Sequence, residues 1–344
     1  MFHPLIVKEV ERLTDKAVTL SFDVPENIQE EFNYLAGQYL TIEETLDGNR
    51  VRRSYSICSA PFEGRLSVGI KQVPNGVFST HANQNIQAGN ILSVAPPEGR
   101  FVLDAVIEQT AYTGIAAGSG ITPILAIAKE VLTQSSSSLF YLVYGNKTPD
   151  DEMFTKEIDL LKATYPSRFI ILKTYSQKEV TGAGFGRIGE SILGELEQRS
   201  GLQSKSYFLC GPEALIGSVS DHLQKKGILS DAIHFELFTA PSADEEKRVP
   251  AGSFQMQLTC DDLHHELQGS AGKTILDVAL ENKLDVPYSC QGGVCSSCIA
   301  RIKKGAAEMT LNQILTDGEI QEGLVLTCQA HPTTPKIEVD YDDV

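Results

Sequence analysis

The sequence has few basic residues for its size and lacks any long apolar run. Its 344 residues include 29 Lys and Arg against 45 Asp and Glu, which gives a formal net charge of −16 at pH 7. Phosphate binding needs a basic surface, so this balance argues against nucleic acid as a partner. No apolar run approaches the length of a membrane span, which argues against insertion into a membrane.

The opening residues also lack the basic stretch and apolar core of a secretory signal peptide. The seven cysteines are an odd number, and three of them crowd into residues 290–298, which does not suit a secreted disulfide framework. We therefore expect a cytoplasmic protein whose clustered cysteines bind metal or take part in catalysis.

Composition divides the chain into several zones and predicts a multidomain protein. Residues 1–104 hold short alternating or apolar runs between Gly, Pro and Asn turns, which predicts an antiparallel β-barrel. Residues 105–239 alternate five buried strand-like runs with four helix-like segments, which predicts an α/β domain with a doubly wound parallel sheet. Residues 240–252 are small, charged and proline-containing, as in a linker. Residues 253–344 open with a hairpin-like pair and a helix with a capping box.

The last zone carries half of the negative charge of the chain. Residues 253–344 contain 14 Asp and Glu against 6 Lys and Arg, a net charge of −8. This charge either serves solubility or forms a docking face for a basic partner.

The cysteine spacing indicates an iron–sulfur cluster. Cys290, Cys295 and Cys298 follow a C-x4-C-x2-C pattern, and 29 residues separate Cys298 from Cys328. Two irons and two sulfides need four thiolates around one small volume, and this is the plant-type [2Fe–2S] spacing. The alternatives are a zinc site and disulfides. Zinc ribbons use paired C-x2-C knuckles, and only one such pair occurs here, so the spacing favours the cluster over zinc.

The segment around these cysteines resembles plant-type ferredoxins. The resemblance rests on "YSCQGGVCSSC" and "LTCQAHP" and implies a β-grasp fold over residues 253–344. Gly292 and Gly293 would let backbone N–H groups approach the cluster sulfurs. Cys58 and Cys260 lie in strand-like runs and are expected to be small buried hydrophobic residues.

Two stretches in the first zone suggest a flavin. "RRSYSICS" (52–59) contains R-x-Y-S, a pattern that an ordinary barrel strand also produces, and "GVFST" (76–80) opens a short helix whose free N–H groups suit a diphosphate. Together they resemble the ferredoxin–NADP reductase family. By that resemblance Arg53 would hold the FAD diphosphate, Tyr55 would stack on the isoalloxazine ring, and Ser56 would bond flavin N5. The same resemblance lines the diphosphate with Gly76, Val77, Phe78, Ser79 and Thr80.

A glycine turn in the second zone suggests a nicotinamide nucleotide. "AAGSGITPIL" stands between a predicted strand and a predicted helix, and Pro123 falls in the first helical turn, where its missing N–H costs nothing. Proline replaces the last glycine of the Rossmann fingerprint, as it does in the same reductase family. We assign to the nucleotide Gly118, Gly120, Thr122 and Pro123.

Two further segments match that family. In "LCGPEAL", Cys210 would lie near the nicotinamide, with Gly211 and Pro212 shaping the turn. Glu236 in "FELF" would face the contact between flavin and nicotinamide, although a sheet-end carboxylate in water is the other interpretation. The resemblance thus gives catalytic roles to Ser56, Cys210 and Glu236.

The choice between NADPH and NADH depends on a few polar residues. A 2′-phosphate wants cationic partners, and "YGNK" offers Asn146 and Lys147 while "GFGR" offers Arg187. These cations can equally be solvated loop charges, and Asp150 and Asp151 lie near Lys147 in the sequence. We favour NADPH over NADH.

The whole chain resembles the reductase components of multicomponent oxygenases. "CQGGVCSSC", "YGNK" and "LTCQAHP" are similar to the reductases of phenylacetyl-CoA epoxidase systems in particular. The resemblance implies electron flow from NAD(P)H to FAD, to [2Fe–2S], and then to a terminal oxygenase component with a di-iron centre. The alternatives are a reductase for a Rieske oxygenase, a desaturase or a hybrid-cluster protein, and a non-catalytic redox-sensing module with vestigial sites.

Overall fold

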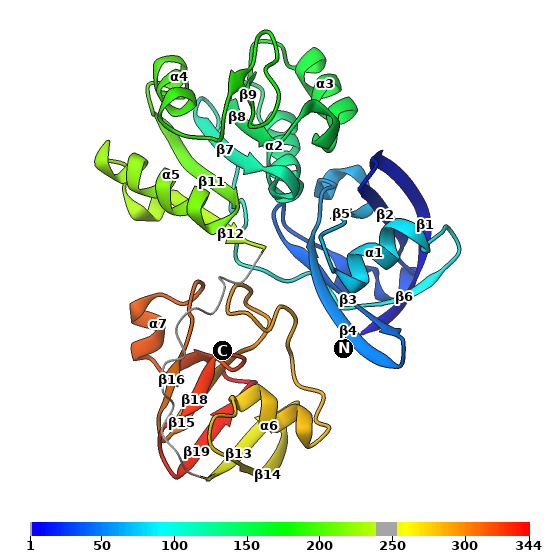
Figure 1. Cartoon of the computed structure of the whole chain (residues 1–344), viewed down its shortest axis with the longest axis vertical. Coiled ribbons are helices and arrows are strands. Elements are labelled where there is room, and N and C mark those ends of the chain that lie inside the picture. Colours follow the sequence, from blue (N-terminus) through cyan, green and yellow to red (C-terminus); the bar gives the residue numbers. More distant parts are fainter. Residues whose placement is uncertain (1, 239–252) are drawn as a thin grey trace. The chain divides into compact units, whose positions relative to one another are not determined.

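The computed structural model of the chain consists of two compact units, Met1–Phe238 and Thr239–Val344 (Figure 1). The structure describes residues 2–238 and 253–344, so the predicted linker 240–252 lies outside the described residues. Within the described ranges no helix is long and apolar enough to cross a membrane.

The N-terminal part of the first unit is an antiparallel β-barrel, as predicted. Its strand order is β4-β3-β6-β1-β2-β5, and a bridge between Ile57, just after β4, and Val68 on β5 joins the two outer strands. Helix α1 (Val77–Gln84) adds Phe78 and Ala82 to the barrel core. The strands are β1 (His3–Thr14), β2 (Ala17–Asp23), β3 (Tyr39–Leu46), β4 (Asn49–Ser56), β5 (Leu66–Lys71) and β6 (Ile91–Val94).

The second part of this unit is a parallel sheet with the order β10-β9-β8-β7-β11-β12. Its central strands are continuous apolar runs because both faces are covered. The strand order reverses between β7 and β11, and in such sheets ligands bind beyond the carboxyl ends at this point. The strands are β7 (Ala111–Ala117), β8 (Leu139–Asn146), β9 (Phe169–Tyr175), β10 (Gly184–Phe185), β11 (Ser204–Gly211) and β12 (Ile233–Leu237).

Four helices connect these strands, as predicted, and the doubly wound sheet is confirmed. They are α2 (Ile121–Gln134), α3 (Thr155–Thr164), α4 (Glu190–Ser200) and α5 (Glu213–Lys225). Two details differ from the prediction. The two-residue strand β10 is a sixth strand, too short to show a periodic pattern. Helix α3 begins at Thr155 rather than near 151, because Pro149–Asp151 forms a 3-10 turn and Phe154 has a positive φ of 61°.

The second unit is a mixed five-stranded sheet of order β14-β13-β19-β15-β17, with a separate β16–β18 pair (Figure 1). Parallel pairing of β13 with β19 and the packing of α6 (Ile275–Glu281) into the core give the predicted β-grasp. The remaining helix is α7 (Asp317–Gln321). The strands are β13 (Phe254–Cys260), β14 (Leu263–Gly269), β15 (Ile299–Lys304), β16 (Ala307–Met309), β17 (Leu324–Leu326), β18 (Ala330–Pro332) and β19 (Lys336–Asp340).

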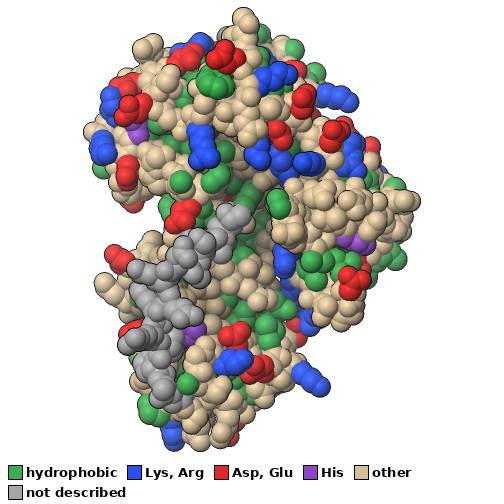
Figure 2. Space-filling view, viewed as in Figure 1, with side chains coloured by type: hydrophobic (Ala, Val, Ile, Leu, Met, Phe, Trp, Pro, Cys, Tyr) green, Lys and Arg blue, Asp and Glu red, His purple; other side chains and the backbone are tan. Residues whose placement is uncertain are grey.

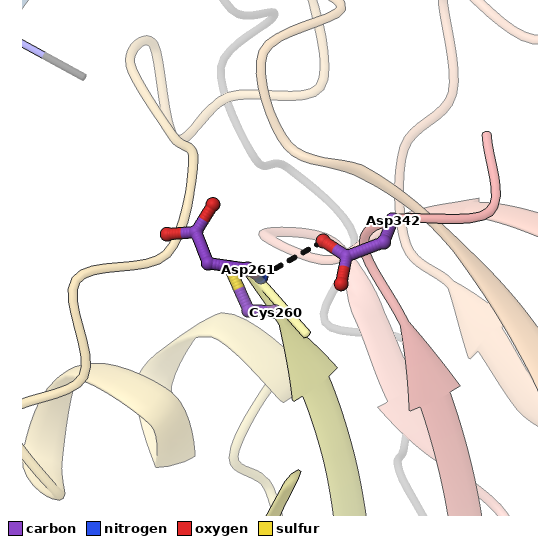
Figure 3. A group of neighbouring side chains, drawn as sticks. All are labelled: Cys260, Asp261 and Asp342. Carbon is purple, nitrogen blue, oxygen red and sulfur yellow. Dashed lines mark hydrogen bonds between the residues drawn. The ribbon is translucent and has the colours of Figure 1, made fainter. Parts of the chain in front are cut away.

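The predicted hairpin of this unit turns at Asp261 and Asp262, both with positive φ. The Asp342 carboxylate accepts a hydrogen bond from the N–H of Asp261 at 2.9 Å (Figure 3). It also accepts one from the N–H of Asp262 at 2.8 Å. Cys260 lies beside this carboxylate and is buried, and burial raises the pKa of its thiol to about 11. Both oxygens of Asp342 are thus used to cap the turn, which gives this group a structural role.

Candidate functional site

The barrel and the parallel sheet meet where β4 and β12 end. Ser56, the last residue of β4, donates a hydrogen bond from Oγ to Oε2 of Glu236 on β12 at 2.9 Å. The two residues are 180 positions apart in the sequence. The structure therefore brings together two of the three residues predicted to be catalytic, one from each domain.

The environment of Glu236 changes its proton affinity. Burial raises the pKa of the Glu236 carboxyl group to about 8, although the Ser56 hydrogen bond acts in the opposite direction. A carboxyl group with such a pKa is largely protonated at neutral pH and can hold or release a proton near that pH. Glu236 is half-buried, and its contact with Ser56 together with the raised pKa favours a site role over a carboxylate at a wet sheet edge.

Cys210 is the third residue of this group. It pairs with Glu236 in the parallel register of β11 and β12, and it is fully buried. Burial, and then the charge of Glu236, raise the pKa of its thiol well above the ordinary range. A thiol that stays protonated is a poor nucleophile, so a role of Cys210 in shaping the site is favoured over one as a nucleophile.

The glycine turn lies against Cys210. Residues Gly118–Gly120 form a 3-10 turn that follows β7 and leads into α2. A Cβ at Gly120 would overlap the carbonyl oxygen of Cys210, so the close approach of these backbones requires glycine there. Thr122 is buried and donates from Oγ1 to the Ser119 carbonyl at 3.0 Å. Pro123 lies in the first turn of α2, as predicted.

The neighbouring edge of the sheet carries an unpaired polar side chain. Asn146 ends β8 and is 8% exposed, and within residues 2–238 and 253–344 neither atom of its amide group makes a hydrogen bond of good geometry, although the Tyr144 hydroxyl lies close enough to interact. A buried polar group without a partner costs about 1–3 kcal/mol. Its place beside the switch point fits a ligand contact, which is what a bound nucleotide would supply.

Lys147 and Arg187 lie beyond the same edge. Both are exposed, and they follow β8 and β10, whose last residues align across Tyr175 of β9. Figure 2 shows Lys and Arg side chains gathered on the viewed face of the first unit. The structure therefore places both predicted cations at the carboxyl edge of the sheet, where a phosphate could bind.

The barrel presents the predicted flavin residues on β4 and at the start of α1. The rings of Tyr55 and Phe78 lie 5.6 Å apart at an angle of 33°, and Arg53 is exposed. Gly76 is the N-cap of α1, so the first N–H groups of this helix are available to an anion. The remaining members of this set are Val77, which is exposed, Ser79, which accepts from the N–H of Val73, and Thr80, which accepts from Gln72.

Sequence reasoning missed Lys71, at the end of β5. Its Nζ lies 4.0 Å from where a Cβ of Gly118 would stand, and it donates to the Asp151 carbonyl oxygen at 3.3 Å. Burial lowers the pKa of Lys71, Asp151 acts in the opposite direction, and the neighbouring lysines add to the lowering. The stretch "GIKQV" predicts a strand and does not indicate a role for Lys71, because nothing in the local sequence shows that the strand ends beside the nucleotide turn.

The four predicted metal-binding cysteines come together in the second unit. The Cys290 sulfur lies within hydrogen-bonding reach of the Cys295 and Cys328 thiols, and Cys298 lies within reach of Cys328. The neighbouring thiols and the N–H groups of Gly292 and Val294 lower the pKa of Cys290. The pKa values of Cys295 and Cys328 are raised in turn, because their thiols share hydrogen bonds with the neighbouring sulfurs. Four sulfurs this close together suit iron, which binds the deprotonated form.

The backbone around these sulfurs explains the two glycines and fits a cluster. Gly292 N–H donates to Cys290 Sγ at 3.3 Å, whereas Gly293 has a φ of 71° and no room for a Cβ beside Leu311 and Gln329. Gln329 also donates to the Gln291 carbonyl at 3.1 Å, which holds the distant segment against the loop. Hydrogen bonds of the protein itself therefore hold the Cys328 segment against the loop.

The other cysteines behave as expected. All seven lie in the described ranges, and no disulfide joins any of them. Cys58 is buried, and burial raises the pKa of its thiol to about 12. Cys58 and Cys260 are therefore packed as small hydrophobic residues.

Three family models match the chain in the order of its folded parts. The first is an oxidoreductase FAD-binding domain over residues 4–103. The second is an oxidoreductase NAD-binding domain over residues 115–221. The third is a 2Fe-2S iron-sulfur cluster binding domain over residues 258–333. The cofactors of the chain are accordingly FAD, NAD(P)H and a [2Fe–2S] cluster.

Similar proteins share this arrangement over their whole length. One of the subunits that make up the 1,2-phenylacetyl-CoA epoxidase of Escherichia coli is 38% identical, over 99% of this chain and 98% of that protein. The ferredoxin reductase component of the 3-ketosteroid-9-alpha-monooxygenase of Mycolicibacterium smegmatis is 32% identical, over 98% and 97%.

A solved structure of phthalate dioxygenase reductase covers 98% of each chain, with a TM-score of 0.61 and 24% identity, and supports the fold. The matching domains and the full-length relatives agree with the sites described above. The chain belongs to the family of NAD(P)H-dependent oxygenase reductases, which carry FAD and [2Fe–2S] and serve a separate oxygenase component.

Proposed function

We propose that the chain is the reductase of a phenylacetyl-CoA epoxidase type of system, whose oxygenase component holds a di-iron centre. The 38% identity to a protein of such an epoxidase over nearly the full length supports this acceptor. The observation that carries the redox function is the contact of Ser56 with Glu236, because it joins the barrel to the nucleotide-binding sheet at one site.

The proposed roles follow the geometry. Tyr55 packs against the flavin ring, Ser56 faces its reactive edge, and Arg53 with the start of α1 holds the diphosphate. The N-cap and first turn of this helix comprise Gly76, Val77, Phe78, Ser79 and Thr80. The nucleotide site comprises Gly118, Gly120, Thr122, Pro123, Asn146, Cys210, Gly211 and Pro212, with Lys71 as an added cation. The cluster ligands are Cys290, Cys295, Cys298 and Cys328.

When held by Arg53, Tyr55 and Ser56, FAD would supply the exchange between the two-electron chemistry of NAD(P)H and the one-electron chemistry of a cluster held by the four cysteines. The chain contributes orientation and exclusion of water. The glycine turn fixes one end of the nucleotide near Cys210, while Ser56 and Glu236 hold a proton at the hydroxyl that faces the flavin.

We further propose that NADPH is preferred over NADH and that the protein works in the cytoplasm. Lys147 and Arg187 at the carboxyl edge would bind a 2′-phosphate. Free thiols throughout the described ranges suit a reducing compartment. The proposed domain boundaries lie near residues 104 and 253. The second of these boundaries separates the cluster unit, which would deliver electrons to the partner protein.

Reconstitution tests the acceptor. The holoprotein is mixed with NADPH and with purified di-iron epoxidase or Rieske-type steroid oxygenase components, and product is measured against uncoupled NADPH oxidation. We expect product to form with the epoxidase component and not with the steroid oxygenase component. The 32% identity to the steroid monooxygenase reductase supports the second candidate, and turnover with that oxygenase in place of the epoxidase would establish it.

A further inference from the structure

A buried lysine on α2 reaches from the nucleotide-binding domain to the barrel. The side chain of Lys129 is 5% exposed. Its Nζ lies 2.5 Å from Oε2 of Glu157 on α3 and 3.0 Å from Oε1 of Glu63, which belongs to the barrel. It also donates to the Cys58 carbonyl oxygen at 3.4 Å. One cation therefore joins two segments of the barrel to two helices of the other domain.

Arg65 completes a balanced group of four charges. Its Nε lies 3.2 Å from Glu63 Oε2, and its Nη2 lies 3.6 Å from Glu157 Oε2. Two cations and two carboxylates thus neutralise one another across the boundary between the domains. Because a buried charge without its partner is strongly unfavourable, such a group holds a single arrangement.

The position of the group connects both cofactor sites. Lys129 lies on the helix that the Gly118–Gly120 turn opens, and Cys58 lies two residues beyond Ser56. The same helix touches the barrel at its first turn, where a Cβ at Gly69 would lie 2.7 Å from Cγ2 of Thr122. Helix α2 therefore contacts the barrel at two points about two turns apart.

We propose that Lys129 is a positioning residue for hydride transfer. By holding α2 at a fixed separation from the Cys58 segment, it sets the distance between the nicotinamide and the flavin. The proposal rests on the placement of the flavin at Ser56 and of the nucleotide at the glycine turn. A misplacement of about 1 Å can slow a reaction about 100-fold, so a small shift of the helix has a measurable effect.

The test is Lys129→Met in the full-length holoprotein. Stopped-flow reduction of bound FAD by NADPH should slow by about 10- to 100-fold, with the KM for NADPH changed less than about threefold. The long-wavelength charge-transfer absorbance between reduced flavin and oxidised nucleotide should weaken, because it depends on the stacking of the two rings.

Arg168→Met is the matched control on the other end of α2. Its guanidinium donates to the carbonyl oxygens of Leu132, Ser135 and Ser138, all within the nucleotide-binding domain. The variant should lower thermal stability yet keep the hydride-transfer rate and the charge-transfer absorbance. Equal losses in both variants would overturn the proposal, and so would a wild-type rate in Lys129→Met.

If Lys129→Met does not fold, Glu63→Gln decides the question, since it removes the barrel carboxylate that pairs with Lys129 and keeps the side-chain shape. A slower hydride transfer in Glu63→Gln supports the proposal, and an unchanged rate overturns it. A Ser56→Ala variant with full hydride transfer would instead overturn the flavin placement, so the two failures are distinguishable.

Discussion

The two redox regions of the molecule are built in opposite ways. Three of the four proposed cluster cysteines come from one loop, residues 290–298, and the fourth is held against it by Gln329. The proposed hydride-transfer site instead draws Ser56 from the barrel and Glu236 from the last strand of another sheet. The cluster site depends on local backbone geometry, whereas the hydride site depends on how two domains pack.

Because of this difference, substitutions at the two sites should impair different electron-transfer steps. The largest loss is expected from a substitution at the cluster. Cys290→Ser removes a proposed thiolate ligand, so electron transfer to a one-electron protein acceptor should fall at least about 1000-fold, since the proposed route from FAD to that acceptor passes through the cluster. NADPH-to-dye activity through the flavin should survive. Stopped-flow assays and low-temperature EPR of the cluster provide the measurement.

Cys260→Ser serves as the control for that variant, because Cys260 is buried outside the cluster loop. It should keep both activities. Loss of dye activity in Cys290→Ser would mean that the two sites are not arranged in a linear order.

The hydride site should respond to changes in the Ser56–Glu236 pair. Ser56→Ala should slow flavin reduction about 100-fold, as removal of a positioned hydrogen bond at a reacting centre does. The negative charge of ionised Glu236 disfavours the arrival of a hydride at the flavin. The rate of flavin reduction in the wild-type protein should therefore fall as pH rises through about 8. Glu236→Gln cannot ionise and should lose that fall.

Rates of flavin reduction measured from pH 6 to 10 test this prediction. The exposed residue Glu195 lies on α4, and Glu195→Gln should keep the wild-type pH profile. An inflection near pH 8 that persists in Glu236→Gln would assign the titration to another group.

The charge of the second unit should affect only the last electron transfer. Residues 253–344 have 14 Asp and Glu against 6 Lys and Arg. If this charge steers a basic partner, electron delivery should fall about tenfold from low to high salt, while dye reduction stays constant. Delivery that is indifferent to ionic strength would leave solubility as the role of the charge.

The smallest effects should arise at the nucleotide cations. Lys147→Ala and Arg187→Ala should each raise the KM for NADPH about fivefold, as expected for an exposed charge contact, and leave the KM for NADH unchanged. Steady-state dye reduction with both nucleotides measures this. Lys226→Ala is the control, because Lys226 pairs with Glu197 within the same domain. Equal changes in the KM for NADPH and for NADH would contradict a contact of these residues with the 2′-phosphate.

The same contrast explains what the sequence could reveal. Spacing alone predicted the cysteines, because ligands on one loop are neighbours in sequence and space. The strand and helix patterns predicted three folded parts, but the two-residue β10 was too short to register. Ser56 and Glu236 were assigned by family resemblance, and only the structure shows their contact.

Residues at the boundary between the domains were the least predictable. Lys71 and Lys129 are ordinary members of a strand and a helix, and their partners lie about 80 and 70 residues away in the sequence. Their significance depends on the docking of the barrel onto the parallel sheet. Periodicity within one element carries no information about that docking.

The central claim is that electrons pass from NADPH through FAD to the cluster in that order. Anaerobic mixing with NADPH, followed by flavin absorbance and freeze-quench EPR of the cluster, measures the order directly. We expect the flavin to be reduced first and the reduced-cluster signal to follow, and to be absent in Cys290→Ser. A cluster signal that precedes flavin reduction would contradict the account.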